Sequence, residues 1–161
     1  MKVRIKFRKT GLMRYIGHLD VMRYFQKVNR RAGVDIAYSA GFSPHQLMSF
    51  ASPLGLGLTG EGEYLDMEVN TCGSSAAIVK RMNAVMAEGM EIVGVWRLFE
   101  GAKPAMAVVA AADYVLTPEP ELWEDIKEKA EAFFAQEAIS VRKKTKKSEK
   151  EVDIRPLIYD W

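Results

Sequence analysis

The segment Lys2-Val3-Arg4-Ile5-Lys6-Phe7-Arg8 alternates cationic and apolar side chains without interruption. A period of two is typical of a strand with one buried face, so 2–8 is predicted to be a β-strand whose exposed face is entirely cationic. Thr10-Gly11 ends this strand. Its apolar face needs a covering layer, and the next segment supplies a helical pattern.

Residues 18–32 repeat apolar side chains at helical spacing, and Gly33 follows as a natural C-cap. The apolar stripe of this predicted helix is Val21, Phe25, Val28 and Ala32. Its opposite face carries four cations, Arg23, Lys27, Arg30 and Arg31. The first strand and the first helix therefore both combine an apolar side with a strongly basic side.

Further strands are predicted over 34–39, 54–58, 63–69 and 92–99, with a second helix over 74–88. The order strand, helix, strands, helix, strand favours an α+β fold, a ferredoxin-like βαββαβ sandwich spanning 1–101. A loop over 40–60, rich in Gly, Pro and Ser, contains no charged side chain. A loop of that length in a compact domain is either functional or partly ordered.

The pattern then restarts over 102–161. We expect a strand over 106–116, a helix over 121–136, and strands over 139–144 and 152–158 joined by a basic hairpin at 143–150. These elements predict a second, incomplete ferredoxin-like unit packed on the first. The outer face of its helix is acidic: Glu121, Glu124, Asp125, Glu128 and Glu131.

The formal net charge of the 161 residues is only +2, but charge is segregated along the chain. Residues 1–31 carry +9, residues 32–141 carry −10 and residues 142–161 carry +3. Such asymmetry favours an anionic partner, although basic and acidic elements could equally neutralise each other within the fold. A hydrophobic content of 48% excludes a disordered chain.

Several protein classes are disfavoured. The single cysteine, Cys72, excludes a disulfide framework and any all-cysteine cluster built by this chain, and it falls at a predicted strand-to-helix turn. The longest wholly apolar run, Ala105–Ala112, is too short to cross a membrane. The N-terminus leads into alternation rather than a signal-peptide core, so we expect a cytoplasmic protein. No cofactor is predicted.

An anion-binding or nucleic-acid-binding surface is the first site hypothesis. Its candidate cations are Arg4, Lys6, Arg8, Lys9, Arg14, Arg23, Lys27, Arg30 and Arg31, and the loop adds Ser43, His45 and Gln46 as polar donors. The exposed sheet face and the outer helix face of such a sandwich point in opposite directions, so two patches are expected. Phe7 falls on the apolar side of its strand, which predicts no aromatic platform for stacking bases.

The two histidines of the chain, His18 and His45, are the second hypothesis. If the loop folds back, they could converge with Tyr38 and act as general base and acid, as metal-independent RNA cleavage requires. The alternative is structural: His18 helps to cap its helix and His45 hydrogen-bonds its own loop. No metal-binding spacing is present, so no metal site is predicted.

Four stretches together resemble a known family: Arg8-Lys9-Thr10-Gly11 with His18-Leu19-Asp20, then Gly41-Phe42-Ser43-Pro44-His45, Ser49-Phe50-Ala51-Ser52-Pro53-Leu54, and Gly60-Glu61-Gly62-Glu63-Tyr64-Leu65-Asp66. The chain resembles the bacterial radical SAM-linked domain of unknown function. That domain is fused to, or encoded beside, a radical SAM protein, often near genes for ribonuclease G and ribosomal proteins. This chain departs from the family pattern at Gln46-Leu47, where Pro-Lys is usual.

The resemblance implies a non-catalytic accessory or substrate-presenting module, with RNA (tRNA or rRNA) and a radical SAM protein as partners. Radical SAM chemistry needs three cluster-binding thiolates, and this chain has one cysteine, so the chain by itself would not hold the cluster. Two alternatives remain open. One is a metal-independent ribonuclease that uses His18 and His45, and the other is a protein-docking module that uses the acidic helix.

Overall fold

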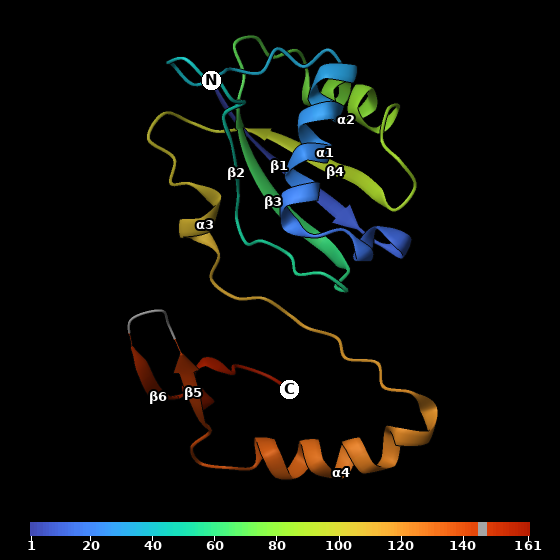
Figure 1. Cartoon of the computed structure of the whole chain (residues 1–161), viewed down its shortest axis with the longest axis vertical. Helices are drawn as coiled ribbons and strands as arrows, with labels where there is room; N and C mark the ends of the chain where they lie inside the picture. Colours follow the sequence, from blue (N-terminus) through green and yellow to red (C-terminus); the bar gives the residue numbers. More distant parts are fainter. Residues whose placement is uncertain (145–147) are drawn as a thin grey trace. The chain divides into compact units, whose positions relative to one another are not determined.

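The computed structural model describes residues 1–144 and 148–161. The chain forms two compact units, Met1–Ala112 and Asp113–Trp161. Figure 1 shows the elements of both units along the chain.

The first unit contains four strands and two principal helices: β1 (Lys2–Lys9), α1 (His18–Arg31), β2 (Met48–Phe50), β3 (Gly60–Glu68), α2 (Ser75–Asn83) and β4 (Met90–Arg97). The strands form one antiparallel sheet in the order β2-β3-β1-β4. Both helices lie on the same side of this sheet (Figure 1) and contribute to one core. This is the predicted α+β, ferredoxin-like βαββαβ arrangement.

The core lies between the sheet and the two helices. Val3, Ile5 and Phe7 of β1 are buried, as their alternation predicts, and the Phe7 ring meets Phe25 of α1 edge to face at 4.8 Å. Leu65 and Met67 of β3 face the same side. The other sheet face, opposite α1 and α2, is called the outer sheet face below. It carries four cationic side chains of β1, those of Lys2, Arg4, Lys6 and Arg8.

The second strand differs from both predicted segments. Residues 34–39 form only isolated bridges, Ile36 with Val69 and Tyr38 with Gln46. Residues 54–58 form a loop bent at Gly57, whose φ is +84°, because the buried Lys9 side chain binds the carbonyl groups of Gly55 and Leu58. A glycine favours such left-handed backbone. The true β2 lies between these segments, inside the predicted loop 40–60.

Helix α2 is shorter than the predicted 74–88. It begins after Ser74, whose hydroxyl accepts a hydrogen bond from the amide of Ala77 at 3.2 Å. It ends at Asn83, whose side-chain amide bonds both the N–H and the C=O of Ile92, at 2.7 and 3.0 Å. The side chain of Asn83 thus hydrogen-bonds β4, and the chain turns back instead of continuing the helix.

Residues 98–105 fold back over one end of the outer sheet face and are called the strap. The amide of Leu98 bonds the carbonyl of Lys2, and the amide of Ala105 bonds the Asp66 carboxylate at 2.7 Å. The predicted strand over 106–116 is wrong. The chain instead forms the short helix α3 (Ala105–Val108) and then an irregular segment, because alanine favours helix over strand and none of the described strands pairs with this stretch.

The second unit contains α4 (Trp123–Phe134) and the hairpin β5 (Ser140–Lys144) with β6 (Glu149–Asp153). The predicted hairpin is present, while the turn residues 145–147 lie outside the described residues. The last predicted strand ends early, at Asp153, because Pro156 favours the 3₁₀ turn Arg155–Leu157. Trp161 stacks on Phe134 with ring centroids 4.8 Å apart.

Among the described residues, no helix is long and apolar enough to cross a bilayer.

Candidate nucleic-acid interface

The cations of the first strand are mostly neutralised on the outer sheet face. Arg4 makes a two-point ion pair with Asp66, from Nε to Oδ1 at 2.8 Å and from Nη2 to Oδ2 at 3.0 Å. Arg8 lies between Glu61 and Glu91, each at 3.0 Å, and Lys2 meets Glu68 at 3.3 Å. The charge pattern left this internal neutralisation open as an alternative. Arg4 and Arg8 are therefore not free anion contacts.

Lys6 is the exception on this face. In residues 1–144 and 148–161, no carboxylate lies within ion-pair distance of its ammonium. The ammonium instead lies 5.9 Å from the ring centroid of Tyr64, its partner residue on β3. A cation over an aromatic face is attracted by the ring quadrupole. The charge of Lys6 remains available to a ligand.

Lys9 is buried, contrary to its place among the predicted surface cations. The period of two that buries Val3, Ile5 and Phe7 also carries Lys9 to the core side. Its ammonium donates to the carbonyl oxygen of Leu58 at 3.2 Å and to that of Gly55 at 3.4 Å. Lys9 thus ties the glycine-containing loop over the end of the sheet.

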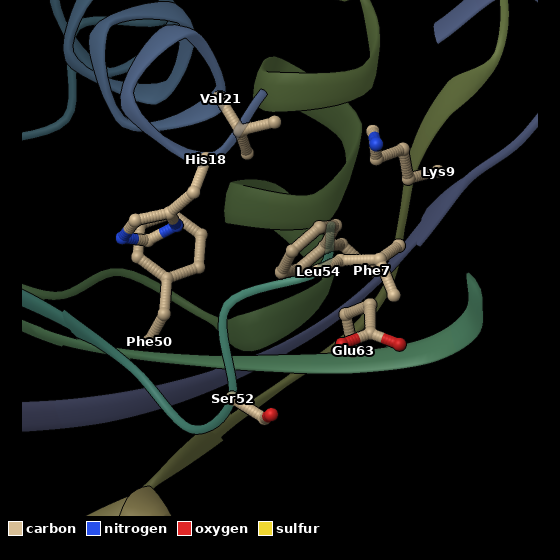
Figure 2. Close-up of a pocket in the computed structure, with 8 residues that line it drawn as sticks. All are labelled: Phe7, Lys9, His18, Val21, Phe50, Ser52, Leu54 and Glu63. Atoms are coloured by element: carbon tan, nitrogen blue, oxygen red, sulfur yellow. The ribbon is translucent and has the colours of Figure 1, made fainter. Parts of the chain in front are cut away.

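A small cavity of about 10 Å³ lies beside Lys9, and Figure 2 shows its lining. The polar side chains at this cavity come from Lys9, His18, Ser52 and Glu63, and the apolar ones from Phe7, Val21, Phe50 and Leu54. The His18 ring packs edge to face on Phe50 at 5.1 Å. This volume is about that of a single water molecule, so the cavity is too small to hold a substrate.

The buried Lys9 and the half-buried Glu63 at this cavity perturb each other's protonation. Burial lowers the pKa of the Lys9 ammonium, and the nearby Glu63 charge partly opposes that shift. Burial likewise raises the pKa of the Glu63 carboxyl, opposed by the charge of Lys9. An amine, a carboxyl and an imidazole therefore lie around one cavity, where Lys9 is buried and Glu63 and His18 are half-buried.

The cations on the helix layer are paired with carboxylates less often than those on the outer sheet face. The outer side of the helix layer carries exposed cations on α1 and α2, here called the helix-layer patch: Arg23, Lys27, Arg30, Arg31 and Arg81. Arg23 pairs with Asp20 at 3.5 Å. For the others, no carboxylate within ion-pair distance is found in the part of the chain that the structure describes.

Two contacts hold the helix-layer patch together. Arg81 of α2 donates to the carbonyl of Gly33, just beyond the end of α1, at 3.2 Å. The Tyr24 hydroxyl of α1 accepts from the amide of Ala87 at 2.7 Å. Burial raises the pKa of Tyr24, and the bond from Ala87 and the nearby Arg31 charge oppose this. The cations of both helices therefore belong to one surface.

The remaining predicted contacts do not join this patch. Arg14 lies in the 3₁₀ turn Gly11–Tyr15 and donates to the neighbouring Tyr15 hydroxyl at 2.7 Å. Gln46 is buried, and its amide bonds the buried Asn29 at 3.0 Å and the Gln26 carbonyl at 3.2 Å. Its hydrogen-bonding groups thus hold the loop to α1. Ser43 is exposed.

The structure does not bring the two histidines together. His18 begins α1, whereas the loop around His45 is tied near Asn29, eleven residues further along the same helix. At 1.5 Å per residue, that spacing is about 16 Å. His45 bonds the Ser39 hydroxyl at 2.8 Å, and Tyr38 lies nearby through its bridge with Gln46. The ribonuclease interpretation thus loses the paired acid and base that it required.

Cys72 and the acidic residues suggest no metal centre. Within residues 1–144 and 148–161, no group of His, Cys, Asp and Glu is arranged to hold a metal ion. Cys72 is half-buried between β3 and α2, at the predicted strand-to-helix turn, and its thiol donates to the carbonyl of Gly73.

The fold and the surfaces together define an α+β, ferredoxin-like protein with a cationic helix layer. A model of the family described as "Uncharacterized protein conserved in bacteria (DUF2344)" matches residues 2–161, and the chain belongs to this family. No curated protein matches the chain.

Sequence reasoning missed two aromatic residues on the outer sheet face, the half-buried Tyr64 and the exposed Trp96. Tyr64 could have been found, because it alternates with the buried Leu65 and Met67 on β3. Trp96 could not, because a bulge in β4 between Ile92 and Gly94 reverses the faces of the strand. Phe7 is buried as predicted, so the aromatic side chains on this face come from other strands.

Proposed function

We propose that this protein is a non-catalytic module that binds RNA through the helix-layer patch. The observation that carries the proposal is the contrast between the two sides of the first unit. The outer sheet face neutralises Lys2, Arg4 and Arg8 with carboxylates, while Lys27, Arg30 and Arg31 lie exposed with no such partner among the described residues.

A line of unpaired cations suits a phosphate backbone. Each Lys or Arg that contacts a phosphate releases bound counterions, so binding of this kind weakens steeply with salt and needs no reading of bases. Of the 21 acidic residues in the sequence, only Asp20 falls on α1 or α2, the two helices that carry the patch. The net charge near zero thus conceals a local surface suited to a polyanion.

The test is a binding series with labelled tRNA across a range of KCl concentrations. The slope of log affinity against log salt is expected to be about −0.9 for each duplex phosphate contact. In the variant Lys27→Gln/Arg30→Gln/Arg31→Gln, we expect the slope to become shallower by roughly 2 to 3 and the affinity at low salt to fall at least tenfold, on the same relation.

The matched control removes three charges outside the patch, in Lys103→Gln/Lys127→Gln/Lys150→Gln, where all three side chains are exposed. It is expected to change the affinity less than threefold, a margin typical of surface substitutions away from a binding site. A slope near zero for the wild type, or equal losses in the two variants, would overturn the proposal.

We further propose that the module serves a radical SAM protein as an accessory, as its resemblance to radical SAM-linked domains implies. The second unit offers a docking surface, because it exposes Glu121 just before α4 and, on α4 itself, Glu124, Asp125, Glu128 and Glu131. Co-purification of the two proteins tests this. Replacing Glu124, Glu128 and Glu131 by Lys is expected to abolish it, whereas the Gln variant of the helix-layer patch should leave it unchanged; the reverse result would refute the docking surface.

A further inference from the structure

The outer sheet face presents two aromatic side chains, one on each side of β1. Tyr64 of β3 pairs directly with Lys6, and Trp96 of β4 pairs with the neighbouring outward residue Arg4. Trp96 is 50% exposed, and Tyr64 is partly exposed. Strands are about 4.8 Å apart, so residues on the two strands that flank β1 stand about 10 Å apart, with Lys6 between them.

Two glycines make room for this arrangement. A Cβ at Gly94, opposite Lys6, would lie only 2.5 Å from Cη2 of the Trp96 indole, so the ring occupies the space that a side chain would fill. A Cβ at Gly62 would lie 3.0 Å from Cε of Lys6. The indole therefore lies across β4, and the lysine stem lies across β3.

The charge between these rings is available. Among the described residues of this face, Lys2, Arg4 and Arg8 each have a carboxylate partner and Lys6 has none. The strap covers the Asp66 end of the face, where the amide of Ala105 bonds Asp66, and leaves the Trp96 side chain exposed. The face thus combines an exposed indole, a partly exposed phenol ring and one cation without a carboxylate partner among the described residues.

We propose that Tyr64, Lys6 and Trp96 form a binding site for an unpaired nucleotide of single-stranded RNA. The base stacks on the exposed indole and the phosphate meets the Lys6 ammonium. Charge complementarity selects this occupant, because the ligand needs both a planar ring and an anion at a spacing of a few ångströms. Aromatic residues on an open sheet face hold bases in this way, and duplex bases are not available to stack.

This inference goes beyond the proposed function, because the proposed site lies on the face opposite the helix-layer patch and binds bases as well as phosphates. Binding at one surface does not depend on binding at the other. The two are separated by comparing a single-stranded oligo-adenylate with an abasic phosphodiester of the same length, which has the same charge and no bases.

The direct readout is the fluorescence of Trp96. The variant Trp123→Phe/Trp161→Phe keeps Trp96 as the one remaining tryptophan of the three in the chain. Adding the ten-nucleotide oligo-adenylate is expected to quench this fluorescence saturably, and adding the abasic oligomer is not. Quenching by both oligomers, or by neither, would overturn the proposal.

Affinity measurements on labelled oligo-adenylate give the second readout. Trp96→Leu is expected to weaken binding by roughly 5- to 150-fold, the usual loss for one stacked base. Gly94→Ala, which displaces the indole without removing it, should weaken binding in the same direction. Gly73→Ala is the matched control, because a Cβ there meets nothing within 4 Å.

Binding of the abasic oligomer shows whether a loss of affinity arises at the Trp96 site or at the helix-layer patch. Trp96→Leu should leave abasic binding unchanged, whereas the Gln variant of the helix-layer patch should weaken both oligomers alike. Circular dichroism and urea unfolding check that each variant is folded. If Trp96→Leu and Gly94→Ala are folded and bind oligo-adenylate within twofold of wild type, the site does not exist.

Discussion

Arg4 and Asp66 face each other across β1 and β3, and each of the two carboxylate oxygens of Asp66 accepts one guanidinium N–H, at 2.8 and 3.0 Å. The hydrogen bonds to Asp66 hold the pKa of the Arg4 guanidinium above its ordinary value. Asp66 also accepts from the amide of Ala105, and Arg4 donates to the carbonyl of Lys103. The Arg4–Asp66 pair thus anchors the Lys103–Ala105 end of the strap.

Breaking this pair is expected to destabilise the first unit. Arg4→Met and Asp66→Leu should each lower the free energy of unfolding by about 3 kcal/mol, because each leaves a largely buried charge without its partner. The double variant should lose less than the sum of the two, with a coupling energy of about 2 kcal/mol. Urea unfolding measures all three, and strictly additive losses would contradict the pairing.

The two single variants should differ at the strap. Only Asp66→Leu removes the acceptor of the Ala105 amide, so hydrogen exchange at that amide is expected to accelerate in Asp66→Leu and to change much less in Arg4→Met. Equal acceleration in both variants would show that the strap depends on the ion pair as a unit rather than on the Asp66 carboxylate.

Lys9 is a buried ammonium whose partners are two loop carbonyls. Lys9→Met keeps the packing volume and removes the cost of burying a charge, so the free energy of unfolding should be equal to wild type or higher. Lys9→Ala should lower it by about 2 to 4 kcal/mol through the cavity left behind. In both variants, amide exchange over 54–58 is expected to rise, since the loop loses its tether.

The lowered pKa of Lys9 also predicts a pH dependence. Between that lowered pKa and the ordinary value of 10.5, the unfolded chain binds more protons at this position than the native chain, so stability should rise with pH across the window. The difference between wild type and Lys9→Met, measured by urea unfolding from neutral pH to pH about 11, should therefore shift in favour of wild type. A flat or opposite trend would contradict the burial of the charged form.

The lowered pKa of Asp35 predicts a change of stability at acid pH, whereas that of Lys9 predicts one at alkaline pH. The Asp35 carboxylate accepts hydrogen bonds from the side chains of Asn70 at 2.9 Å and Thr71 at 2.8 Å, and these bonds lower its pKa below the ordinary value of 3.8. Its contribution to stability is thus present above pH 3.8 and is lost as the pH falls through the lowered pKa. The stability advantage of wild type over Asp35→Leu should shrink in acid, as thermal unfolding at several pH values would measure.

Gly89 and Gly101 form a matched pair for a backbone test. Both have left-handed backbone, with φ of +86° and +83°. A Cβ at Gly89 would also lie 2.6 Å from the carbonyl oxygen of Thr10, whereas a Cβ at Gly101 meets nothing within 4 Å. Gly101→Ala should cost about 1 kcal/mol of unfolding free energy from strain alone. Gly89→Ala should cost clearly more, and equal losses would count against the close approach.

Much of the first unit could be predicted because its patterns are local. The alternation from Lys2 to Arg8 identified β1 and its buried face, and the stripe of Val21, Phe25 and Val28 identified α1. The order of these elements led to the ferredoxin-like fold. The predictions that failed depended on distant partners: Lys9 bends the loop at 54–58, Asn83 ends α2 by bonding Ile92, and the 106–116 segment pairs with none of the strands that the structure describes.

The candidate site likewise has features that follow from local spacing in the sequence and features that depend on distant residues. The sequence alone determined that Lys27, Arg30 and Arg31 share the polar face of one helix, because helical periodicity depends only on spacing. Whether a cation keeps its charge free depends on the neighbouring strand, and only the tertiary structure pairs Arg4 with Asp66 while leaving Lys6 between Tyr64 and Trp96. A strict period of two from Ile92 would have buried Trp96. The bulge before Gly94 turns it outward, because one unpaired residue exchanges the two faces of a strand.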